Sequence, residues 1–278
     1  MKAATLSSNA TVSYEVSDHS YEQDGIRFLT IYSRSLGGRG DISVFSPSNG
    51  KGHSSLPVVL LLHGVRSSHW AWFFKGGAHH TVSHLIDIGR VRPMLLVAPS
   101  DGLYGEGSGY LAHSDRDFET WIMRDVLDVV RELPGTADDS ELFVTGLSMG
   151  GYGALRLGAK YPDTFSGISA HSPITSIEEL QKVISFPFPS QGINAGEADI
   201  LEWVKSHREH LPPIRFDCGI SDSLLLCARS LHESLTASLV PHRFYEFAGG
   251  HNWDYWRQHF EDSLLFFEEI LSLKEATG

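Results

Sequence analysis

The chain has 278 residues, of which 41% are hydrophobic and 20% are charged, a composition typical of a compact globular protein with a sizeable core. Its formal net charge of −12 argues against nucleic-acid binding and disfavours anionic membrane surfaces, since no basic stripe is present to neutralise phosphates. The two cysteines, Cys218 and Cys227, are too few for a disulfide framework and lie in apolar surroundings, so we expect buried free thiols.

The beginning of the chain carries no recognisable targeting signal. Residues 1–10 are small and polar and lack the apolar stretch of a secretion signal. The longest apolar run, residues 58–62, is far too short to span a membrane. We therefore expect a cytoplasmic protein that does not associate with membranes, unless a secretion signal has already been removed from this chain.

The first predicted elements are strands. Residues 11–16 have the character of an edge strand, and residues 28–34 and 41–45 read as an antiparallel pair around a glycine-rich turn. After a loop rich in Ser, Gly and Pro come two continuous apolar runs, 57–62 and 93–98. Such runs predict strands that are buried on both faces, as in a parallel sheet.

Strands and helices alternate along the rest of the chain. Further strands are predicted at 142–145, 165–170, 213–218 and 242–247, and helices at 80–88, 118–133, 195–207, 223–239 and 254–273. This alternation predicts an α/β fold with a mostly parallel central sheet covered by helices on both faces. We find no linker or internal repeat and predict one domain, residues 1–278. The irregular segment 175–210 is interpreted as a cap-like insertion over the sheet.

A short motif between a predicted strand and a predicted helix carries the first chemical signal. Residues 146–150 read Gly-Leu-Ser-Met-Gly. In this context Gly-x-Ser-x-Gly is typical of a nucleophile elbow, a strained turn that presents the serine hydroxyl at a helix N-terminus. So short a pattern also arises by chance. The interpretation of Ser148 as a nucleophile therefore depends on partners elsewhere in the chain.

A serine hydroxyl needs a base, usually a histidine that a carboxylate orients, and in α/β hydrolases the acid precedes the histidine in the chain. His251 follows two glycines directly after the last predicted strand, where the base belongs. Asp217 and Asp222 are both candidates for the acid. We prefer Asp222, because it lies in the loop beyond the carboxyl end of its strand. The alternative role for Asp222 is a helix N-cap.

The oxyanion that forms during attack needs two backbone N–H donors. One candidate is Met149, the residue after the serine. The other is Val65, which follows an early strand and the conformationally free Gly64. Trp70 and Trp253 are candidates for substrate contacts, the alternative being that they pack in the core.

Together these motifs resemble the esterase D-like family of α/β hydrolases, which includes S-formylglutathione hydrolases, feruloyl and acetyl-xylan esterases, and mycolyltransferases. The matching positions are Leu36-Gly37, His63-Gly64-Val65, the elbow at 146–151, Gly219 with Asp222, and Gly249-Gly250-His251 with Trp253 and Trp256. The resemblance extends over residues 28–271. It implies a Ser148/Asp222/His251 triad with Val65 and Met149 as oxyanion donors, and it supports Asp222 over Asp217. Within it, the sequence departs from the family's pattern at residues 175–210, so substrate choice is not implied.

We therefore predict a serine carboxylesterase that acts on small-molecule esters of short-chain or aryl acids, such as acetyl or feruloyl esters. We expect no cofactor, and no metal, because the histidines at 79, 80 and 84 have no carboxylate at ligand spacing. A thioesterase of the S-formylglutathione hydrolase type and an acyltransferase would use the same triad and are the alternatives. A binding protein on this fold would normally have lost a triad member. The sequence does not indicate the oligomeric state.

Overall fold

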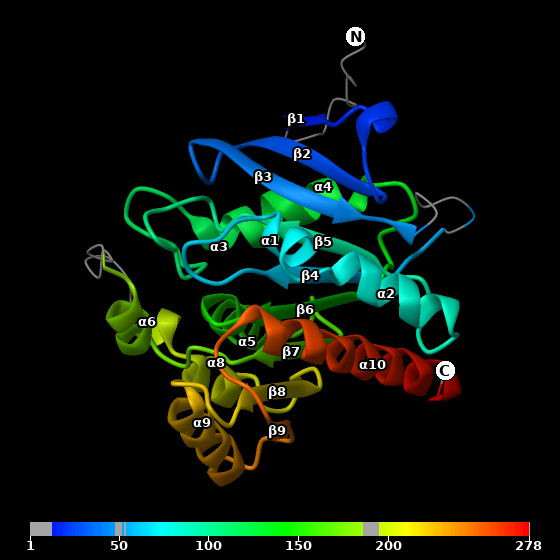
Figure 1. Cartoon of the computed structure of the whole chain (residues 1–278). Helices are drawn as coiled ribbons and strands as arrows, with labels where there is room; N and C mark the ends of the chain where they lie inside the picture. The colour runs from blue at the N-terminus through cyan, green and yellow to red at the C-terminus, as the bar shows by residue number, and fades with distance from the viewer. Residues whose placement is uncertain (1–12, 48–51, 53, 186–194, 278) are drawn as a thin grey trace.

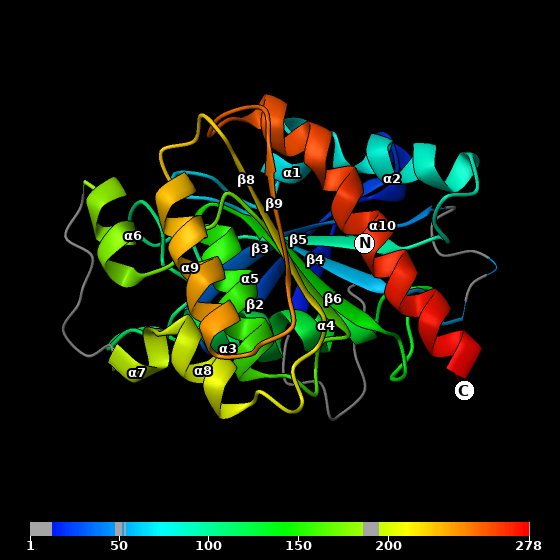
Figure 2. The ribbon, with the colours of Figure 1, turned by 90° about the horizontal axis from the view of Figure 1, so that it is seen from below.

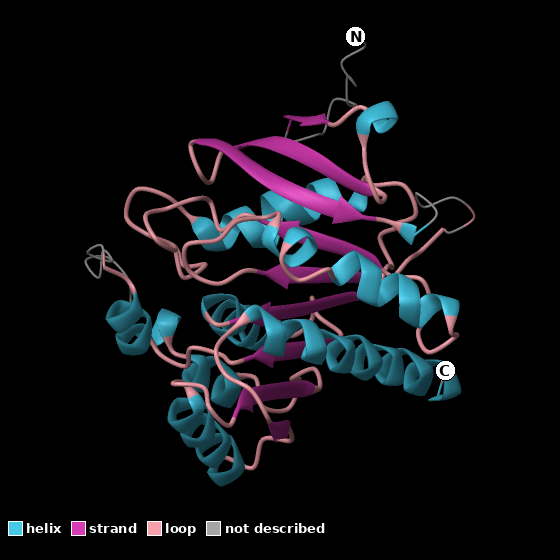
Figure 3. Cartoon of the chain, in the orientation of Figure 1, coloured by secondary structure: helices cyan, strands magenta, loops and turns pink. Residues whose placement is uncertain are grey.

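The fold is organised around one central sheet. The computed structural model describes residues 13–47, 52, 54–185 and 195–277. Within them, strands lie in the order β1-β2-β3-β5-β4-β6-β7-β8-β9 (Figure 1, Figure 3). The pairs among β1, β2, β3 and β5 are antiparallel, and the remaining pairs are parallel. The strands are β1 Ser13–Val16, β2 Ile26–Ser33, β3 Gly38–Phe45, β4 Val58–Leu62, β5 Leu95–Pro99, β6 Leu142–Leu147, β7 Gly167–His171, β8 Ile214–Gly219 and β9 Arg243–Phe247.

The central strands are apolar throughout because both faces of the sheet are covered. Every residue of β4 is buried. Leu60 and Leu62 belong to the core on one face, whereas Val59 and Leu61 belong to the core on the other. Successive side chains of the strand thus point into two separate cores, which explains why the apolar run of β4 is continuous rather than alternating.

Helices cover the two faces of the sheet (Figure 2). Residues of α1, α2 and α10 form one core with the sheet, and residues of α3 to α9 contribute to the other. The helices are η1 His19–Tyr21, α1 Ala71–Phe74, α2 Ala78–Asp87, α3 Phe118–Thr120, the π-helical segment η3 Trp121–Val126, α4 Leu127–Arg131, α5 Met149–Lys160, α6 Ile177–Val183, α7 Ala195–Ala198, α8 Ile200–Ser206, α9 Leu225–Ala237 and α10 Trp253–Thr277. Among the described residues, no helix is both long enough and apolar enough to cross a membrane.

The predicted α/β fold with a mostly parallel sheet is confirmed, and most predicted elements lie within a few residues of their observed bounds. The helix predicted at 195–207 is instead two helices, because the Asp199 carboxylate accepts the Leu201 N–H at 2.7 Å and begins α8. Of the predicted insertion 175–210, residues 186–194 lie outside the described part of the chain, as do residues 1–12. The single domain and the cap-like role of the insertion stay predictions.

The carboxyl ends of β6 to β9 meet at one edge of the sheet. Leu147 pairs with His171, and His171 pairs with Asp217. Gly219, the last residue of β8, pairs with Phe247, the last residue of β9. The loops that leave these strands therefore emerge side by side, at the edge where α/β folds hold their sites.

Candidate active site

Ser148 joins β6 to α5 in a strained conformation. Its φ of 56° and ψ of −118° lie outside the regions that L-residues ordinarily adopt. A Cβ atom on Gly146 would come closer than 3.0 Å to the Gly150 carbonyl, and one on Gly150 would come equally close to the Leu62 carbonyl. Both positions therefore require glycine. The Ser148 N–H donates to the His171 carbonyl at 3.0 Å, which ties the turn to β7.

A chain of hydrogen bonds connects Ser148 with two residues from other loops. Ser148 Oγ lies 3.0 Å from Nε2 of His251, and Nδ1 of His251 lies 2.9 Å from the Asp222 carboxylate. Because an ionised carboxylate only accepts hydrogen bonds, Nδ1 carries the proton and the neutral ring leaves Nε2 free to accept one from the serine. Burial raises the pKa of Asp222, but hydrogen bonds from His251 and the Leu224 N–H outweigh it and hold that pKa below its usual value.

The loops that carry Asp222 and His251 touch through their backbones. A Cβ atom on Gly219 would come closer than 3.0 Å to the Gly249 carbonyl, and the Ser221 N–H donates to that carbonyl at 2.9 Å. The His251 ring packs edge-on against Trp256, with 5.0 Å between the ring centroids. These contacts fix the direction of the imidazole from both sides.

The alternative acid, Asp217, belongs to a different, fully buried network beneath the elbow. Its carboxylate accepts hydrogen bonds from His171 Nδ1 at 2.9 Å, Arg215 Nη1 at 2.7 Å and the Tyr255 hydroxyl at 2.8 Å. Nε2 of His171 in turn lies 2.8 Å from the Ser263 hydroxyl. Of the two aspartates that the sequence left open, the structure brings Asp222 to His251.

The two predicted oxyanion donors belong to segments that lie next to the serine. Met149 is the first residue of α5 and is buried. Val65 follows Gly64, at which a Cβ atom would lie 3.3 Å from Ser148 Cβ. A Cβ atom on Gly107 would lie within 3.4 Å of side-chain atoms of both Met149 and Val65. One loop therefore packs against both predicted donors, whose roles stay predictions.

A protein-family model described as "Putative esterase" matches residues 33–267, which is most of the chain. The chain belongs to the esterase family. This esterase is 26% identical over 239 residues to an acetyl esterase from Caldicellulosiruptor saccharolyticus, an alignment that covers 78% of this chain and 85% of that protein. It is 28% identical over 166 residues to an S-formylglutathione hydrolase from Arabidopsis thaliana, covering 52% of this chain and 55% of that protein.

Solved structures show the same fold. A ferulic acid esterase superposes with a TM-score of 0.76 at 24% identity, covering 93% of this esterase and 98% of that chain. An S-formylglutathione hydrolase from Agrobacterium tumefaciens superposes with a TM-score of 0.74 at 20% identity, covering 90% and 97% of the two chains. The esterase is thus a carboxylic ester hydrolase with the α/β-hydrolase fold, and the predicted resemblance to the esterase D-like family is confirmed.

The two tryptophans predicted to contact substrate differ in exposure. Trp70 of the esterase is 40% exposed. Trp253 is half-buried, packs edge-on against Trp72 and Trp256, and lies 5.9 Å from the Lys75 ammonium. Trp253 therefore serves at least in part to pack the base loop onto α1, while a substrate contact by either residue stays a prediction.

Arg66 and Glu106 were not predicted as site residues from the sequence; they join the segment after Val65 to a loop after β5. Their side chains form an ion pair with a 2.9 Å separation. They are 40 residues apart in the chain, and neither belongs to a recognisable motif. His63, by contrast, is structural: Nδ1 lies 2.8 Å from the Gly64 carbonyl, and Nε2 accepts the Asp101 N–H at 3.0 Å.

Histidine clusters outside the triad have packing roles. The rings of His79 and His80 lie 3.9 Å apart, and His79 also packs against Phe45 and Phe73. Within the part of the chain that the structure describes, no group of three or more His, Cys, Asp or Glu side chains is placed to hold a metal ion. Cys218 is buried and Cys227 half-buried, and both are free thiols.

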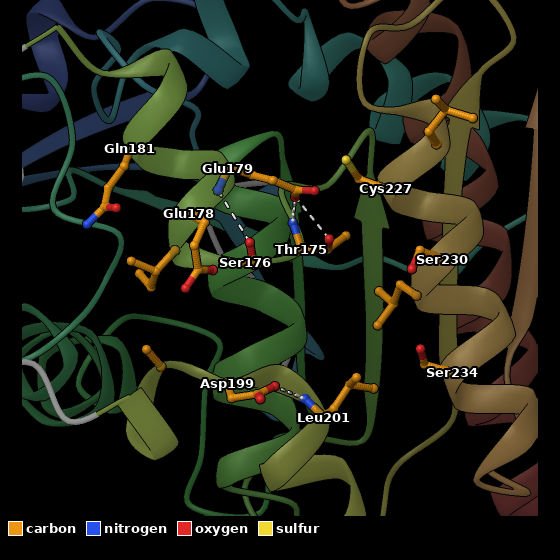
Figure 4. A pocket seen from close by; sticks show the side chains of 14 residues that line it. Thr175, Ser176, Glu178, Glu179, Gln181, Asp199, Leu201, Cys227, Ser230 and Ser234 are labelled. Carbon is orange, nitrogen blue, oxygen red and sulfur yellow. Dashed lines mark hydrogen bonds between the residues drawn. The ribbon is translucent and has the colours of Figure 1, made fainter.

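A groove of about 750 Å³ runs between α6, α8 and α9 (Figure 4). Thr175 lines the groove, and the Ile174 N–H next to it donates to the Ser148 carbonyl at 3.1 Å. The lining includes the carboxylates of Glu178, Glu179 and Asp199. None of the described residues that line the groove is Lys, Arg or His, so its charged groups are all acidic, and they lie among apolar side chains such as Ile177, Leu201 and Leu226.

Proposed function

We propose that Ser148, His251 and Asp222 are the catalytic triad of this esterase. The observation that carries the proposal is the hydrogen-bonded chain from Asp222 through His251 to Ser148, with separations of 2.9 and 3.0 Å. The strained turn at the start of α5 supports it, because a helix N-terminus favours the negative charge that develops there.

In the proposed reaction, Ser148 Oγ attacks the ester carbonyl carbon while His251 Nε2 takes its proton. Asp222 holds the imidazole in place and stabilises its charged form, and the N–H groups of Val65 and Met149 stabilise the tetrahedral oxyanion. When the intermediate collapses, the bond from carbonyl carbon to alcohol oxygen breaks and His251 protonates the leaving alcohol. Water then attacks the acyl-enzyme with His251 as base, which releases the acid and restores Ser148.

We infer that the substrates are small esters of short-chain or aryl acids. The similarity to an acetyl esterase supports a short acyl group, and the likeness in fold to a ferulic acid esterase is compatible with an aryl one. A thioesterase is the second candidate, because a relative 28% identical over 166 residues is an S-formylglutathione hydrolase. Turnover of S-formylglutathione and p-nitrophenyl acetate, compared at equal enzyme concentration, separates the two candidates.

The first test is Ser148→Ala. We expect this variant to lose p-nitrophenyl acetate hydrolysis by roughly 10⁴-fold or more in kcat, because no covalent intermediate can form. Ser206→Ala is the matched control, since that hydroxyl is exposed at the end of α8 and donates to the Glu202 carbonyl at 2.7 Å. Circular dichroism checks that both variants fold. A Ser148→Ala variant with kcat near that of the control would refute the proposed nucleophile.

A further inference from the structure

The loop of residues 101–110 is anchored firmly at its base. The buried Asp101 carboxylate accepts the Ser108 N–H at 2.7 Å, and the Ser108 hydroxyl donates to the Asp101 carbonyl at 2.7 Å. The Asp101 N–H donates to His63 Nε2 at 3.0 Å. Because His63 precedes Val65 by two residues, the loop and the proposed oxyanion segment form one hydrogen-bonded unit.

The far end of this loop carries Glu106, which is bonded to Arg66 twice. The Arg66 N–H donates to the Glu106 carbonyl at 2.7 Å, and Arg66 Nη2 donates to the Glu106 carboxylate at 2.9 Å. The same carboxylate oxygen accepts the Ser185 N–H at 2.6 Å. Arg66 Nη2 also donates to the Val183 carbonyl at 2.9 Å and to the Ser185 hydroxyl at 3.3 Å. The pair therefore joins the segment after Val65 to the end of α6, a wall of the groove.

The backbone of Arg66 is itself unusual. Its φ of 55° lies in the left-handed region, which a residue other than glycine rarely occupies. Such a conformation persists only when its surroundings determine it. The surroundings here are the two hydrogen bonds to Glu106, and Val65 is the residue immediately before Arg66.

We propose that Glu106 and Arg66 are positioning residues that hold the Val65 N–H in the oxyanion hole and couple it to helix α6. This inference rests on the proposed function of Val65 as an oxyanion donor. The competing explanation is an ordinary surface ion pair, since the Arg66 side chain is 55% exposed and the Glu106 side chain 24% exposed. Such pairs contribute little to stability. A large loss of catalysis without a loss of stability therefore distinguishes a positioning role from an ordinary surface ion pair.

The kinetic signature of positioning is specific. An oxyanion donor must lie about 2.7–3.1 Å from the oxygen of the transition state, and a small displacement weakens that contact without changing how the substrate binds. Loss of the pair should therefore lower kcat and leave KM nearly constant. It should also weaken binding of phenylboronic acid, whose adduct with the serine places an oxygen in the same hole.

We test this with Glu106→Ala and Arg66→Ala in the full chain. For each variant we expect kcat to fall about 10- to 100-fold with KM within about twofold, and the Kd of phenylboronic acid to rise in parallel. The double variant should be no worse than the weaker single variant, because both remove the same contact. Glu106→Gln keeps an oxygen that can accept the Ser185 N–H, so it should recover part of the lost activity.

Glu246→Ala is the matched control, because Glu246 is also paired with one arginine, Arg229, at 2.6 and 2.7 Å on the protein surface. If Glu106→Ala and Arg66→Ala behave like this control, the positioning role is overturned. A loss of folding, seen as a lower urea midpoint than the control, would assign the pair a structural role and also overturn it. If Ser148→Ala retains activity, the proposed function itself fails, so the two failures are distinguishable.

Discussion

Two aspartates five residues apart in this chain occupy environments that suit different tasks. Asp222 faces a histidine that is partly exposed, with 31% of the His251 side chain accessible to solvent. Asp217 is fully buried and holds three donors at once. The first arrangement orients a base that must exchange protons with a substrate, whereas the second neutralises charge inside the core.

Exchanging each carboxylate for an amide should therefore give opposite results. Asp222→Asn should lower kcat by about 10⁴-fold, because the imidazole loses its correct tautomer, with little change in stability. Asp217→Asn should lower the free energy of unfolding by about 3–5 kcal/mol, because His171 and Arg215 lose a buried partner. Steady-state kinetics and urea unfolding on both variants check this. Equal kinetic defects would contradict the division of roles.

The pH dependence of stability should also report Asp217. Burial raises the pKa of Asp217, but the charges and hydrogen bonds of His171 and Arg215 outweigh it and lower that pKa to about 2. An unfolded aspartate titrates near about 3.9, so ionised Asp217 stabilises the fold above about pH 4 and this contribution is lost as the pH falls towards about 2. The free energy of unfolding, measured with urea at several pH values across this window, should change less with pH for Asp217→Asn than for the unmodified chain. An equal dependence on pH in the two proteins would contradict the assignment.

Individual residues were predictable from sequence where a local motif carried them. Ser148 lies between Gly146 and Gly150, and His251 follows Gly249 and Gly250, in each case just after a strand. The order in which nucleophile, acid and base follow one another in the chain left few other candidates for these roles. The choice between Asp217 and Asp222 was not settled by the residues themselves, because both lie near the end of β8. Glu106 and Arg66 were missed because only the folded chain brings their loops together.

At the scale of elements, the elbow depends on how closely β4, β6 and α5 approach. Gly150 faces the carbonyl of Leu62, and no side chain at this position can move away because the contact is with backbone. Gly150→Ala should therefore cost about 3 kcal/mol of unfolding free energy and abolish activity. Gly38→Ala is the control, since the nearest atom to an added Cβ lies 4.0 Å away. Thermal unfolding of both variants tests this, and an unshifted Tm for Gly150→Ala would contradict it.

The alternating elements were predictable because the strands are buried on both faces and the glycine-rich turns mark their ends. The two helices α7 and α8 were predicted as one. The residue between them, Asp199, can also occur inside a helix, and only the folded structure shows that its side chain caps the second helix. The π-helical segment Trp121–Val126 was likewise invisible in a pattern that has apolar residues at helical spacing. Both differences arise from local hydrogen bonding that apolar periodicity does not encode.

At the scale of the whole molecule, negative charge should select among substrates. The net charge is −12, and the groove between α6, α8 and α9 is lined by Glu178, Glu179 and Asp199. A substrate with an acyl carboxylate, such as p-nitrophenyl hemisuccinate, should have a lower kcat/KM than p-nitrophenyl acetate. Raising the ionic strength from about 0.01 to 0.15 M shortens the Debye length from about 30 to 8 Å and should narrow that difference. A ratio independent of salt would contradict an electrostatic origin.

The contact between the loops that contain Gly219 and Gly249 has a consequence for how this esterase loses activity on heating. Both loops leave β8 and β9, and β9 is the last strand of the sheet, with none of its residues buried. Strands at such an edge open locally at a lower free energy than the core. Turnover should therefore cease at a temperature below that at which the helices melt. The temperature up to which this esterase stays active is then set by its outermost strand, β9, and substitutions that stabilise β9 should raise it.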